Sequence, residues 1–304
     1  MFDLYKHAGW IGGKGIAIQG LSSNAIHTLL FPLPPLSEQY RIATALDVVQ
    51  PQIESYAKVE TVLNNLNTSF PDALKKSILQ QAVQGKLVPQ DPADEPASIL
   101  LERIRTEKQR LVKEGKIKKD KHESVIFRRD NSHYELVDGV ERCIDEELPF
   151  EIPESWMWDR LGNVFSLQAG KNIQASEIEE AIFDGAFLCY GGNGIRGYVG
   201  RFNREGDYPI IGRQGALCGN INRATGKFYA TEHAVCVETF CNIDVDWTCL
   251  FLNALNLNQY ATATAQPGLA VAKINQVLIP VPPLSEQHRI AAKIEELLPL
   301  IQSI

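Results

Sequence analysis

The chain carries the sequence PLPPLSEQYRIA at residues 32–43 and repeats it as PVPPLSEQHRIA at residues 280–291, with ten of the twelve positions identical. In each copy an apolar run closes on prolines, which predicts a strand that ends in a turn. The Ser-Glu-Gln that follows predicts a helix start, because Ser37 can act as the N-cap and Glu38 suits the first turn. The repeat therefore predicts two globular segments that end in the same helix start.

The residues after the first copy predict a long helix over residues 38–66. Pro51 lies inside this range and predicts a kink or a short break, since an internal proline removes a hydrogen bond. Pro299 stands at the matching position after the second copy, so the kink belongs to the repeated element. Apolar side chains recur in steps of four and three, which is typical of a helix that packs lengthwise on another helix; they are Ile42, Leu46, Val49, Ile53 and Tyr56.

The rest of the chain mixes helical and strand-like segments, which predicts an α+β fold. A further helix is expected to start near Ser69–Pro71 and to end at Gly85. From Trp156 onward, short β-like runs alternate with Gly and Asn, followed by a helical stretch at 248–261 and a closing strand at 274–284. Another helix is expected over residues 97–115, and its predicted apolar side consists of Ile99, Leu100, Ile104 and Leu111.

Composition and charge exclude few classes of protein. No apolar run reaches the ~18 residues of a membrane span, so we expect a cytoplasmic protein. The six cysteines include no Cys-x-x-Cys pair that would indicate zinc, so we expect no metal. The net charge of −7 is unevenly distributed: residues 101–129 hold eleven Lys and Arg against five acids, whereas residues 130–159 hold one against ten. The acidic total therefore leaves room for a basic face that binds nucleic acid.

No stretch predicts catalytic chemistry. GNGIRG at residues 192–197 has the spacing G-x-G-x-x-G, but the residues after it do not form a helix and no acid lies at the required distance. We interpret its glycines as positions that allow close approach of another surface. His233, in TEHAV, is interpreted as a hydrogen-bonded strand histidine rather than a general base.

Four phrases resemble the specificity subunit of type I restriction–modification systems. They are PLPPLSEQYRIA, LKKSILQQAVQGKLVPQDPADEPASILLERIRTEKQRLVKEGKIKK, IPESWMWDRLG and PVPPLSEQHRIA. The resemblance implies a non-catalytic protein with two target-recognition domains, each followed by a conserved helix. The two helices would pack as an antiparallel coiled-coil spacer, and each domain would read one half of a bipartite double-stranded DNA target. A helix over residues 38–66 would span roughly 43 Å, which is enough to place two readers about one DNA turn apart.

The resemblance also implies partners and domain boundaries. It implies docking onto methyltransferase (M) subunits that bind S-adenosylmethionine and onto an ATP-driven restriction (R) subunit, with no cofactor on this chain. Residues 1–36 are expected to be the end of a first recognition domain, and residues 37–149 the central conserved helical region and linker. Residues 150–284 are expected to form the second recognition domain, and residues 285–304 to begin the distal helix.

The candidate DNA-binding residues lie in glycine-rich stretches of the second recognition domain. Arginine pairs bidentately with guanine and asparagine or glutamine with adenine, whereas lysine and arginine also position phosphates. We expect base contacts from Asn193, Arg196, Arg213 and Gln214, and backbone contacts from Lys171, Arg201 and Lys227; Asn222 lies on a further candidate loop. The aromatic residues nearby are interpreted as core; they are Tyr190, Tyr198, Phe202 and Tyr229.

Three alternatives stay open at this stage. The chain could be a half-size specificity subunit that forms a homodimer through its helices and reads a symmetric site. It could be an assembly scaffold that does not read DNA. It could also be the recognition portion of a fused restriction enzyme, although no nuclease or methyltransferase motif is present in the sequence.

Overall fold

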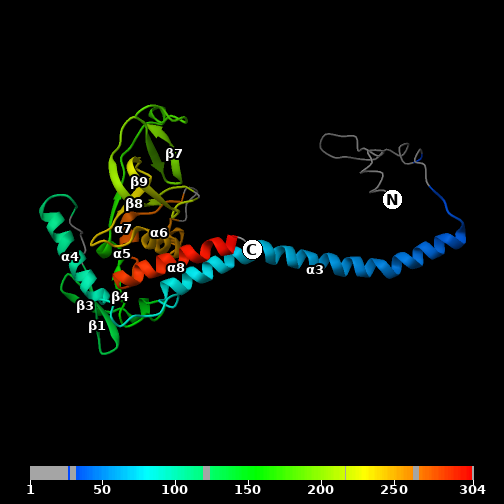
Figure 1. Ribbon diagram of the computed structural model, residues 1–304, viewed down its shortest axis with the longest axis horizontal. Helices are drawn as coiled ribbons and strands as arrows, with labels where there is room; N and C mark the ends of the chain where they lie inside the picture. Colours follow the sequence, from blue (N-terminus) through cyan, green and yellow to red (C-terminus); the bar gives the residue numbers. More distant parts are fainter. Residues whose placement is uncertain (1–26, 28–31, 119–123, 216, 263–266, 303–304) are drawn as a thin grey trace. The chain divides into compact units, whose positions relative to one another are not determined.

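The computed structural model describes residues 27, 32–118, 124–215, 217–262 and 267–302. Contacts divide the chain into two compact units, Met1–Leu66 and Asn67–Ile304. In the first unit the structure describes the proline-rich turn and the N-terminal part of helix α3 (Leu36–Val83). The second unit contains the rest of α3 and the other helices and strands named below (Figure 1).

Helix α3 is a single helix of 48 residues. The predicted helix start near Ser69–Pro71 is wrong, because α3 runs through Pro71. At Pro51 the predicted short break is wrong as well, whereas the kink that was predicted as the alternative stays a prediction. Each proline destabilises the helix by about 3 kcal/mol, because it removes one backbone hydrogen bond. The long run of helix-forming residues on either side of each proline outweighs this loss. The predicted end is confirmed, since α3 stops at Val83 and Gly85 adopts φ of +68°, which glycine tolerates best.

The predicted apolar seam of α3 is exposed to solvent. Its five residues are between 44% and 69% exposed, namely Ile42, Leu46, Val49, Ile53 and Tyr56. None of the described helices is apolar over a length that could cross a membrane. Packing of the stripe on another helix stays a prediction.

The two copies of the repeat form the same local structure. The amides of Glu38 and Gln39 donate to the carbonyl of Pro35 at 2.9 and 3.0 Å, and the same two positions in the second copy donate to the carbonyl of Pro283 at 3.0 Å each. The Gln39 side chain donates to the carbonyl of Pro34 at 2.8 Å, as Gln287 does to Pro282 at 3.1 Å. The helices begin at Leu36 and Leu284, so the prediction that Ser37 is the N-cap is wrong by two residues: the proline before each leucine occupies that position.

The second copy is buried, because its Glu286 joins three segments of the chain. Its carboxylate accepts hydrogen bonds from the Trp156 indole at 2.8 Å and from Gln90 at 2.6 Å. Arg289, one turn later on helix α8 (Leu284–Gln302), forms a bidentate pair with Asp94 at 2.6 and 3.1 Å. Burial raises the pKa of Glu286, and the hydrogen bonds from Trp156 and Gln90 oppose this rise. Glu286 thus fixes α8 against the loop that follows α3.

Residues 161–275 contain a six-stranded sheet and the short helices that cover it. The sheet order is β5 (Ser166–Ala169), β10 (Ala234–Glu238), β8 (Arg204–Gly212), β9 (Ile221–Ala230), β6 (Phe187–Gly191) and β7 (Gly194–Val199). Its neighbours are antiparallel except for β6 and β9, which are parallel. The helices are α5 (Leu161–Val164), α6 (Val245–Ala254) and α7 (Val271–Asn275), with short 3₁₀ turns at Asp145–Glu147, Ala175–Glu177 and Leu257–Tyr260. This mixture confirms the predicted α+β class.

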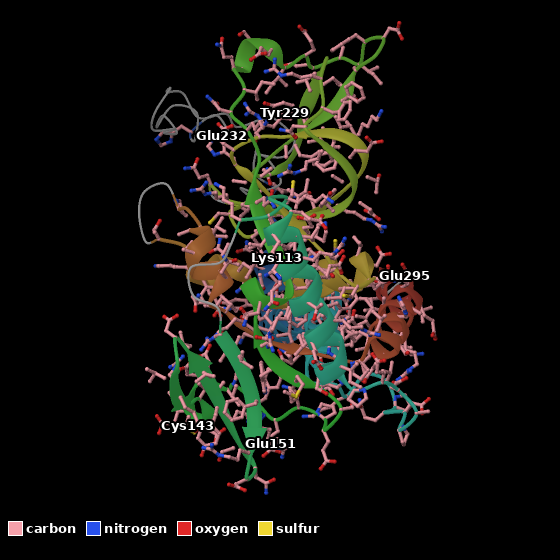
Figure 2. All side chains as sticks on the ribbon, turned by 90° about the vertical axis from the view of Figure 1, so that its left-hand side faces the viewer. Lys113, Cys143, Glu151, Tyr229, Glu232 and Glu295 are labelled. Carbon is pink, nitrogen blue, oxygen red and sulfur yellow. The ribbon has the colours of Figure 1, made fainter. Side chains whose placement is uncertain are left out.

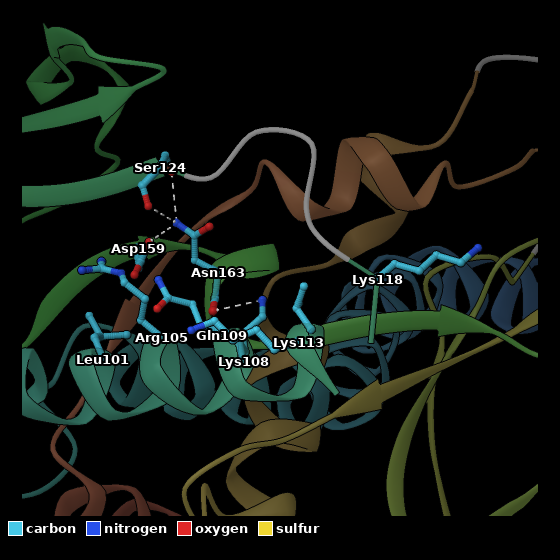
Figure 3. A pocket seen from close by; sticks show the side chains of 10 residues that line it. Leu101, Arg105, Lys108, Gln109, Lys113, Lys118, Ser124, Asp159 and Asn163 are labelled. Carbon is cyan, nitrogen blue, oxygen red and sulfur yellow. Dashed lines mark hydrogen bonds between the residues drawn. The ribbon is translucent and has the colours of Figure 1, made fainter. Parts of the chain in front are cut away.

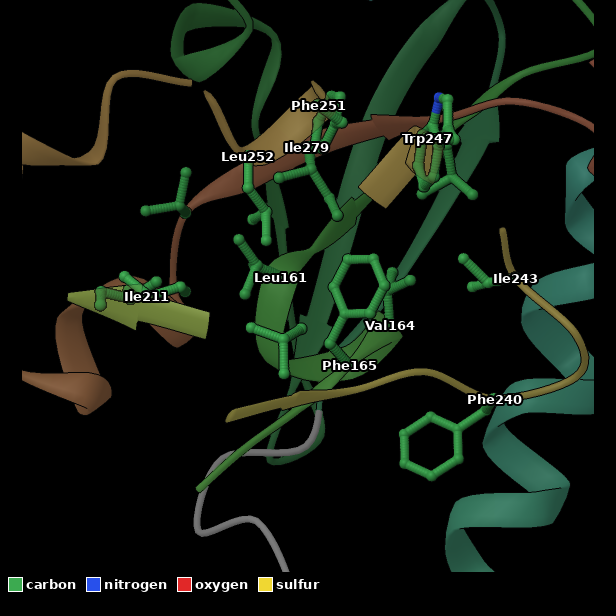
Figure 4. Close-up of a cluster of buried hydrophobic side chains, with 14 of the residues drawn as sticks. Leu161, Val164, Phe165, Ile211, Phe240, Ile243, Trp247, Phe251, Leu252 and Ile279 are labelled. Carbon is green, nitrogen blue, oxygen red and sulfur yellow. The ribbon is translucent and has the colours of Figure 1, made fainter. Parts of the chain in front are cut away.

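The largest apolar cluster lies between these helices, the strand ends and the long helices (Figure 4). Leu161 and Val164 of α5 are fully buried in it, together with Leu252 of α6. Helix α4 (Ala97–Lys113) contributes Leu100, Leu101 and Ile104. The predicted apolar side of α4 was partly wrong, because Ile99 is 44% exposed and Leu101 is buried instead.

A three-stranded antiparallel sheet precedes the six-stranded sheet in the chain and was not predicted from the sequence. It consists of β1 (Ser124–Arg129), β2 (Ser132–Val137) and β3 (Val140–Cys143). In Figure 1 these strands lie near β4 (Met157–Arg160), which pairs with β11 (Leu278–Val281). Figure 2 shows Cys143 of β3 and Tyr229 of β9 at opposite ends of the second unit, with Lys113 of α4 between them.

A buried ion pair attaches this sheet to β4. The Arg160 guanidinium donates to both oxygens of Glu135, at 2.9 and 2.7 Å, and to the carbonyl of Gln276 at 2.7 Å. Arg142 and Glu147 complete the network. Burial alone would raise the pKa of Glu135, but the hydrogen bonds from Arg160 and Arg142 outweigh it and lower the pKa to about 2.

Replacing Glu135 with glutamine is expected to lower the free energy of unfolding at pH 7 by about 3 kcal/mol, because the buried Arg160 would lose its buried counter-charge and keep only the more exposed Glu147. The folded-state pKa lies below the ordinary value of 4.5, so the carboxylate stabilises the fold fully above that value and loses its effect toward pH 2. Urea denaturation should therefore show the wild-type advantage shrinking as pH falls through this range. As a control, Glu141→Gln removes an exposed pair with Arg129 and should cost less than about 1 kcal/mol. Equal losses in the two variants would contradict the assignment.

The repeat offers a matched test of burial at one motif position. Glu286→Ala leaves the Trp156 indole and the Gln90 amide without their buried acceptor, and should cost about 2–4 kcal/mol of unfolding free energy. Glu38→Ala changes the same position of the first copy, where the side chain is exposed, and should stay within about 0.5 kcal/mol. Thermal and chemical denaturation of the two variants check this, and a similar loss in both would refute the difference in burial.

Candidate nucleic-acid interface

The ends of β6, β8 and β9 meet at one short turn. Thr231, directly after β9, donates its amide to the carbonyl of Tyr190 in β6 at 2.9 Å. Arg213, directly after β8, donates its amide to the carbonyl of His233 at 2.9 Å. Because Ala230 is aligned with Tyr190 and Ala234 with Gly212, the turn at residues 231–233 lies between the β6–β7 turn and the β8–β9 connection.

Glycines allow these backbones to approach so closely. A Cβ atom at Gly212 would lie 1.9 Å from the carbonyl oxygen of Gly192, and one at Gly192 would lie 3.1 Å from that of Gln214. Gly194 has φ of +95°, which the tight turn between β6 and β7 requires. GNGIRG therefore forms a β-hairpin turn, in agreement with the interpretation that its glycines serve close approach.

Six of the eight predicted DNA-binding residues gather around this turn, and we call them the turn cluster. They are Lys171, Asn193, Arg196, Arg213, Gln214 and Asn222. Lys171 lies opposite Thr231 through an isolated β-bridge, and the Arg196 side chain covers Gly191. A Cβ at Gly194 would lie 3.0 Å from the Asn222 side-chain oxygen, so the β6–β7 turn and β9 are in contact.

The residues of the turn cluster differ in solvent exposure and in the hydrogen bonds that their side chains make. Lys171, Asn193, Arg196 and Gln214 are exposed, whereas Arg213 and Asn222 are half-buried. The Nε of Arg213 donates to the carbonyl of Leu269 at 3.3 Å, which fixes the side chain and leaves its terminal nitrogens for another acceptor. Base contacts by these residues stay a prediction.

Arg201 and Lys227 lie apart from the turn cluster, toward the other end of β6. Arg201 forms an ion pair with Glu177 at 2.8 Å and lies over the Tyr229 ring. Lys227 lies over the Phe202 ring and 3.9 Å from Glu205. Both cations are therefore already partly neutralised. A contact of either with DNA phosphate stays a prediction and would require exchange of the present partner.

Most of the neighbouring aromatic residues pack inside the sheet. Tyr190 and Tyr229 are 6% and 4% exposed, and the Tyr190 ring lies edge-on to Phe228 at 5.5 Å between centroids. Burial raises the pKa of Tyr190, which keeps its phenol neutral. Core packing is thus confirmed for these two, while Phe202 is 42% exposed and does not follow the prediction.

Three buried polar atoms at the same turn have no hydrogen-bond partner among the described residues. They are the Asn222 amide nitrogen, the Thr231 hydroxyl and one carboxylate oxygen of Glu232. Such groups cost about 1–3 kcal/mol each when left unpaired, so this turn is a place where a bound water or another polar group would stabilise the fold. Amide, hydroxyl and carboxylate are groups that read base edges, with Glu suited to the amino group of cytosine.

Sequence reasoning found Asn222 but missed Thr231 and Glu232. The available signal was the polar TEH at residues 231–233 between two apolar strands, of which only His233 was considered. His233 forms a 3.1 Å contact with the second oxygen of Glu232. The carboxylate thus belongs to the candidate interface, and its charge favours a base amino group over phosphate.

Thr231→Val is expected to leave the free energy of unfolding unchanged or to raise it by up to about 1 kcal/mol, because the buried hydroxyl has no partner to lose. Urea denaturation measures this. Thr248→Val is the control, since the Thr248 hydroxyl donates to the carbonyl of Asp244 at 2.7 Å and its removal should cost about 1 kcal/mol. A loss at Thr231 as large as at Thr248 would show that the hydroxyl has a partner within the fold.

Comparison with known proteins assigns a family to this segment. Residues 153–303 match the family described as the type I restriction modification DNA specificity domain. The matched range includes β4 to β11, the turn cluster and α8. The segment that carries the candidate interface is thus a DNA specificity domain by sequence.

Individual relatives carry the same designation. The EcoprrI specificity subunit of Escherichia coli is 47% identical over 145 residues, which cover 47% of this chain and 36% of the relative. The EcoAI specificity subunit of Escherichia coli is 30% identical, with 88% of this chain and 53% of the relative covered. A solved S subunit from M. genitalium has 15% identity and a TM-score of 0.46, with 98% of this chain and 64% of that chain covered. Residues 153–303 belong to the family of type I restriction modification DNA specificity domains, and the chain as a whole is similar to type I specificity subunits. The chain spans 53% of the EcoAI relative and 36% of the EcoprrI relative.

Proposed function

We propose that this chain recognises DNA sequence for a type I restriction–modification complex and breaks no bonds itself. The turn cluster reads one half of a bipartite target in the major groove, and the helical segments dock methyltransferase subunits. S-adenosylmethionine and ATP act on the partner subunits, so the chain needs no cofactor of its own. The family assignment supports DNA recognition in general, and the finer statements rest on the residues below.

The observation that carries this proposal is the convergence of readout chemistry at one turn. Asn193, Gln214 and Asn222 offer amides, Lys171, Arg196 and Arg213 offer cations, and the Asn222, Thr231 and Glu232 side chains hold the unpaired polar atoms. These residues come from five separate stretches of chain but surround the same glycine contacts. A groove of DNA presents donors, acceptors and phosphates together, and therefore matches this mixture better than a small apolar ligand would.

The exposed stripe of α3 supports docking of another helix. Its apolar residues follow the four–three spacing of a coiled-coil seam, and water exposure of such a seam is unfavourable. A methyltransferase subunit is the partner that we propose for it. The same stripe also favours the alternative of a homodimer of half-size subunits. The mass of the purified chain in solution separates this homodimer from docking of a methyltransferase subunit, because only the homodimer forms without added subunits.

The proposal is tested by binding of the purified chain, with its methyltransferase partner, to a random DNA pool at several salt concentrations. Specific enrichment of a sequence is expected, and log K should fall by about 0.9 per phosphate contact for each tenfold rise in salt. Binding that shows no sequence preference at any salt concentration would reduce the chain to an assembly scaffold.

Arg213→Ala should weaken binding to the enriched sequence by about 1–3 kcal/mol and relax the preference at one base position. The fixed Arg213 side chain leaves its terminal nitrogens for a base edge, which is the physical reason for position-specific loss. Gel-shift titration against single-base variants of the target measures this. Arg129→Ala, in the small sheet, is the control and should leave affinity unchanged. A uniform loss across all targets would assign Arg213 to a phosphate instead.

A further inference from the structure

A cavity of about 320 Å³ lies beside α4, away from the turn cluster (Figure 3). Its walls come from α4, from Lys118, and from Ser124, Asp159 and Asn163, which belong to β1, β4 and α5. Figure 2 shows Lys113, at the end of α4, well separated from Glu232 of the candidate DNA interface. Small-molecule sites commonly have volumes of roughly 300–1,000 Å³, so the cavity is large enough for a small organic ligand.

The floor of this cavity is held in place by its own hydrogen bonds. The Asn163 amide donates to Asp159 at 2.6 Å and to both the carbonyl and the hydroxyl of Ser124 at 3.0 Å. The Lys108 ammonium donates to the carbonyl of Gly162 at 2.5 Å and to that of Phe165 at 3.2 Å. A floor with fixed rotamers is preorganised, and a ligand would not need to order it.

Asp159 places a buried carboxyl group at this floor. Its side chain is only 4% exposed, and the amide of Arg160 donates to the same oxygen that Asn163 contacts. Burial raises the pKa of Asp159 to about 6, while the Asn163 hydrogen bond and the nearby Arg105 and Lys108 charges oppose the rise. The cavity thus offers an acceptor for a hydrogen-bond donor of a ligand.

The wall formed by α4 supplies positive charge and apolar surface. Arg105 is half-buried and has no hydrogen bond or ion pair with the described residues, although its charge reaches Asp159. Lys113 and Gln109 also line the cavity, and Leu101 and Val112 provide apolar contact. A guanidinium that is partly removed from water without an acceptor is unfavourable, and its planar fork matches a carboxylate or phosphate.

We propose that this cavity binds a small organic anion that combines an oxyanion, an apolar body and one N–H donor. The oxyanion would contact Arg105 and Lys113, the body would lie against Leu101 and Val112, and the donor would reach Asp159. The ligand would join α4 to β1, β4 and α5, and would stabilise the folded chain by mass action. This site is independent of the proposed DNA-reading function, because no residue of the turn cluster lines it.

Calorimetry on the full chain tests the proposal with four probes: adenosine 5′-monophosphate, 4-aminobenzoate, adenosine and inorganic phosphate. Saturable binding is expected for at least one of the first two, and a probe that binds should do so at least tenfold tighter than adenosine or phosphate alone. The first two probes distinguish a phosphate from a carboxylate ligand. Absence of saturable binding by both at millimolar concentration, or equal binding of adenosine, overturns the proposal.

Variants on opposite sides of α4 test the geometry. Arg105→Ala should weaken binding at least tenfold and Arg105→Lys by less, whereas Arg103→Ala, which removes an exposed pair with Glu95 outside the cavity, should have no effect. Asp159→Asn should reduce the preference for 4-aminobenzoate over benzoate toward one, with circular dichroism to verify folding. Equal weakening by Arg103→Ala and Arg105→Ala, or an unchanged preference in folded Asp159→Asn, would refute the assigned contacts.

Discussion

The buried carboxylate of Glu286 links three segments of the second unit that are distant in sequence. Glu286 stands at the start of α8, accepts from the Trp156 indole and from Gln90, and is flanked by the Arg289–Asp94 pair. These contacts join segments almost 200 residues apart in sequence, which no local preference could bring together. Because burial disfavours a charged group unless donors surround it, the arrangement is stable only when all three segments are in place.

The same principle explains how the small sheet is attached. Arg160 sits on β4 and is neutralised by Glu135 of β2, with Arg142 and Glu147 around them. The sheet therefore depends on a polar contact at its junction with β4, alongside the apolar contact of Ile126 and Ile144 with Trp158. At both junctions, charged residues that the sequence alone would place on the surface are buried. The ends of β6, β8 and β9, with the turn cluster, take no part in either junction.

At the candidate interface, glycines allow two backbone segments to come close, and three buried polar atoms have no hydrogen-bond partner among the described residues. Gly192 and Gly212 let two backbone segments touch, and this contact brings Asn193, Gln214 and Thr231 to the same turn. The unpaired atoms of Asn222, Thr231 and Glu232 reduce stability in the free protein. In the proposed function, polar groups that are satisfied only by the correct bases would discriminate against wrong ones.

The sequence by itself determined the repeat, the α+β class and the glycine-rich stretches that carry six residues of the turn cluster. These features depend on neighbours in the chain: the Pro-Pro-Leu-Ser-Glu-Gln motif makes the same backbone hydrogen bonds in both copies. Sequence reasoning failed at Pro71, where the helix-forming residues around the proline outweighed a local penalty. It also failed at β1–β3, where charged residues such as Glu135 concealed strands. Only the tertiary structure decided which copy of the motif is buried and which residues complete the turn. Burial, ion pairing and unpaired polar atoms arise from contacts between distant segments, and a linear pattern does not record them.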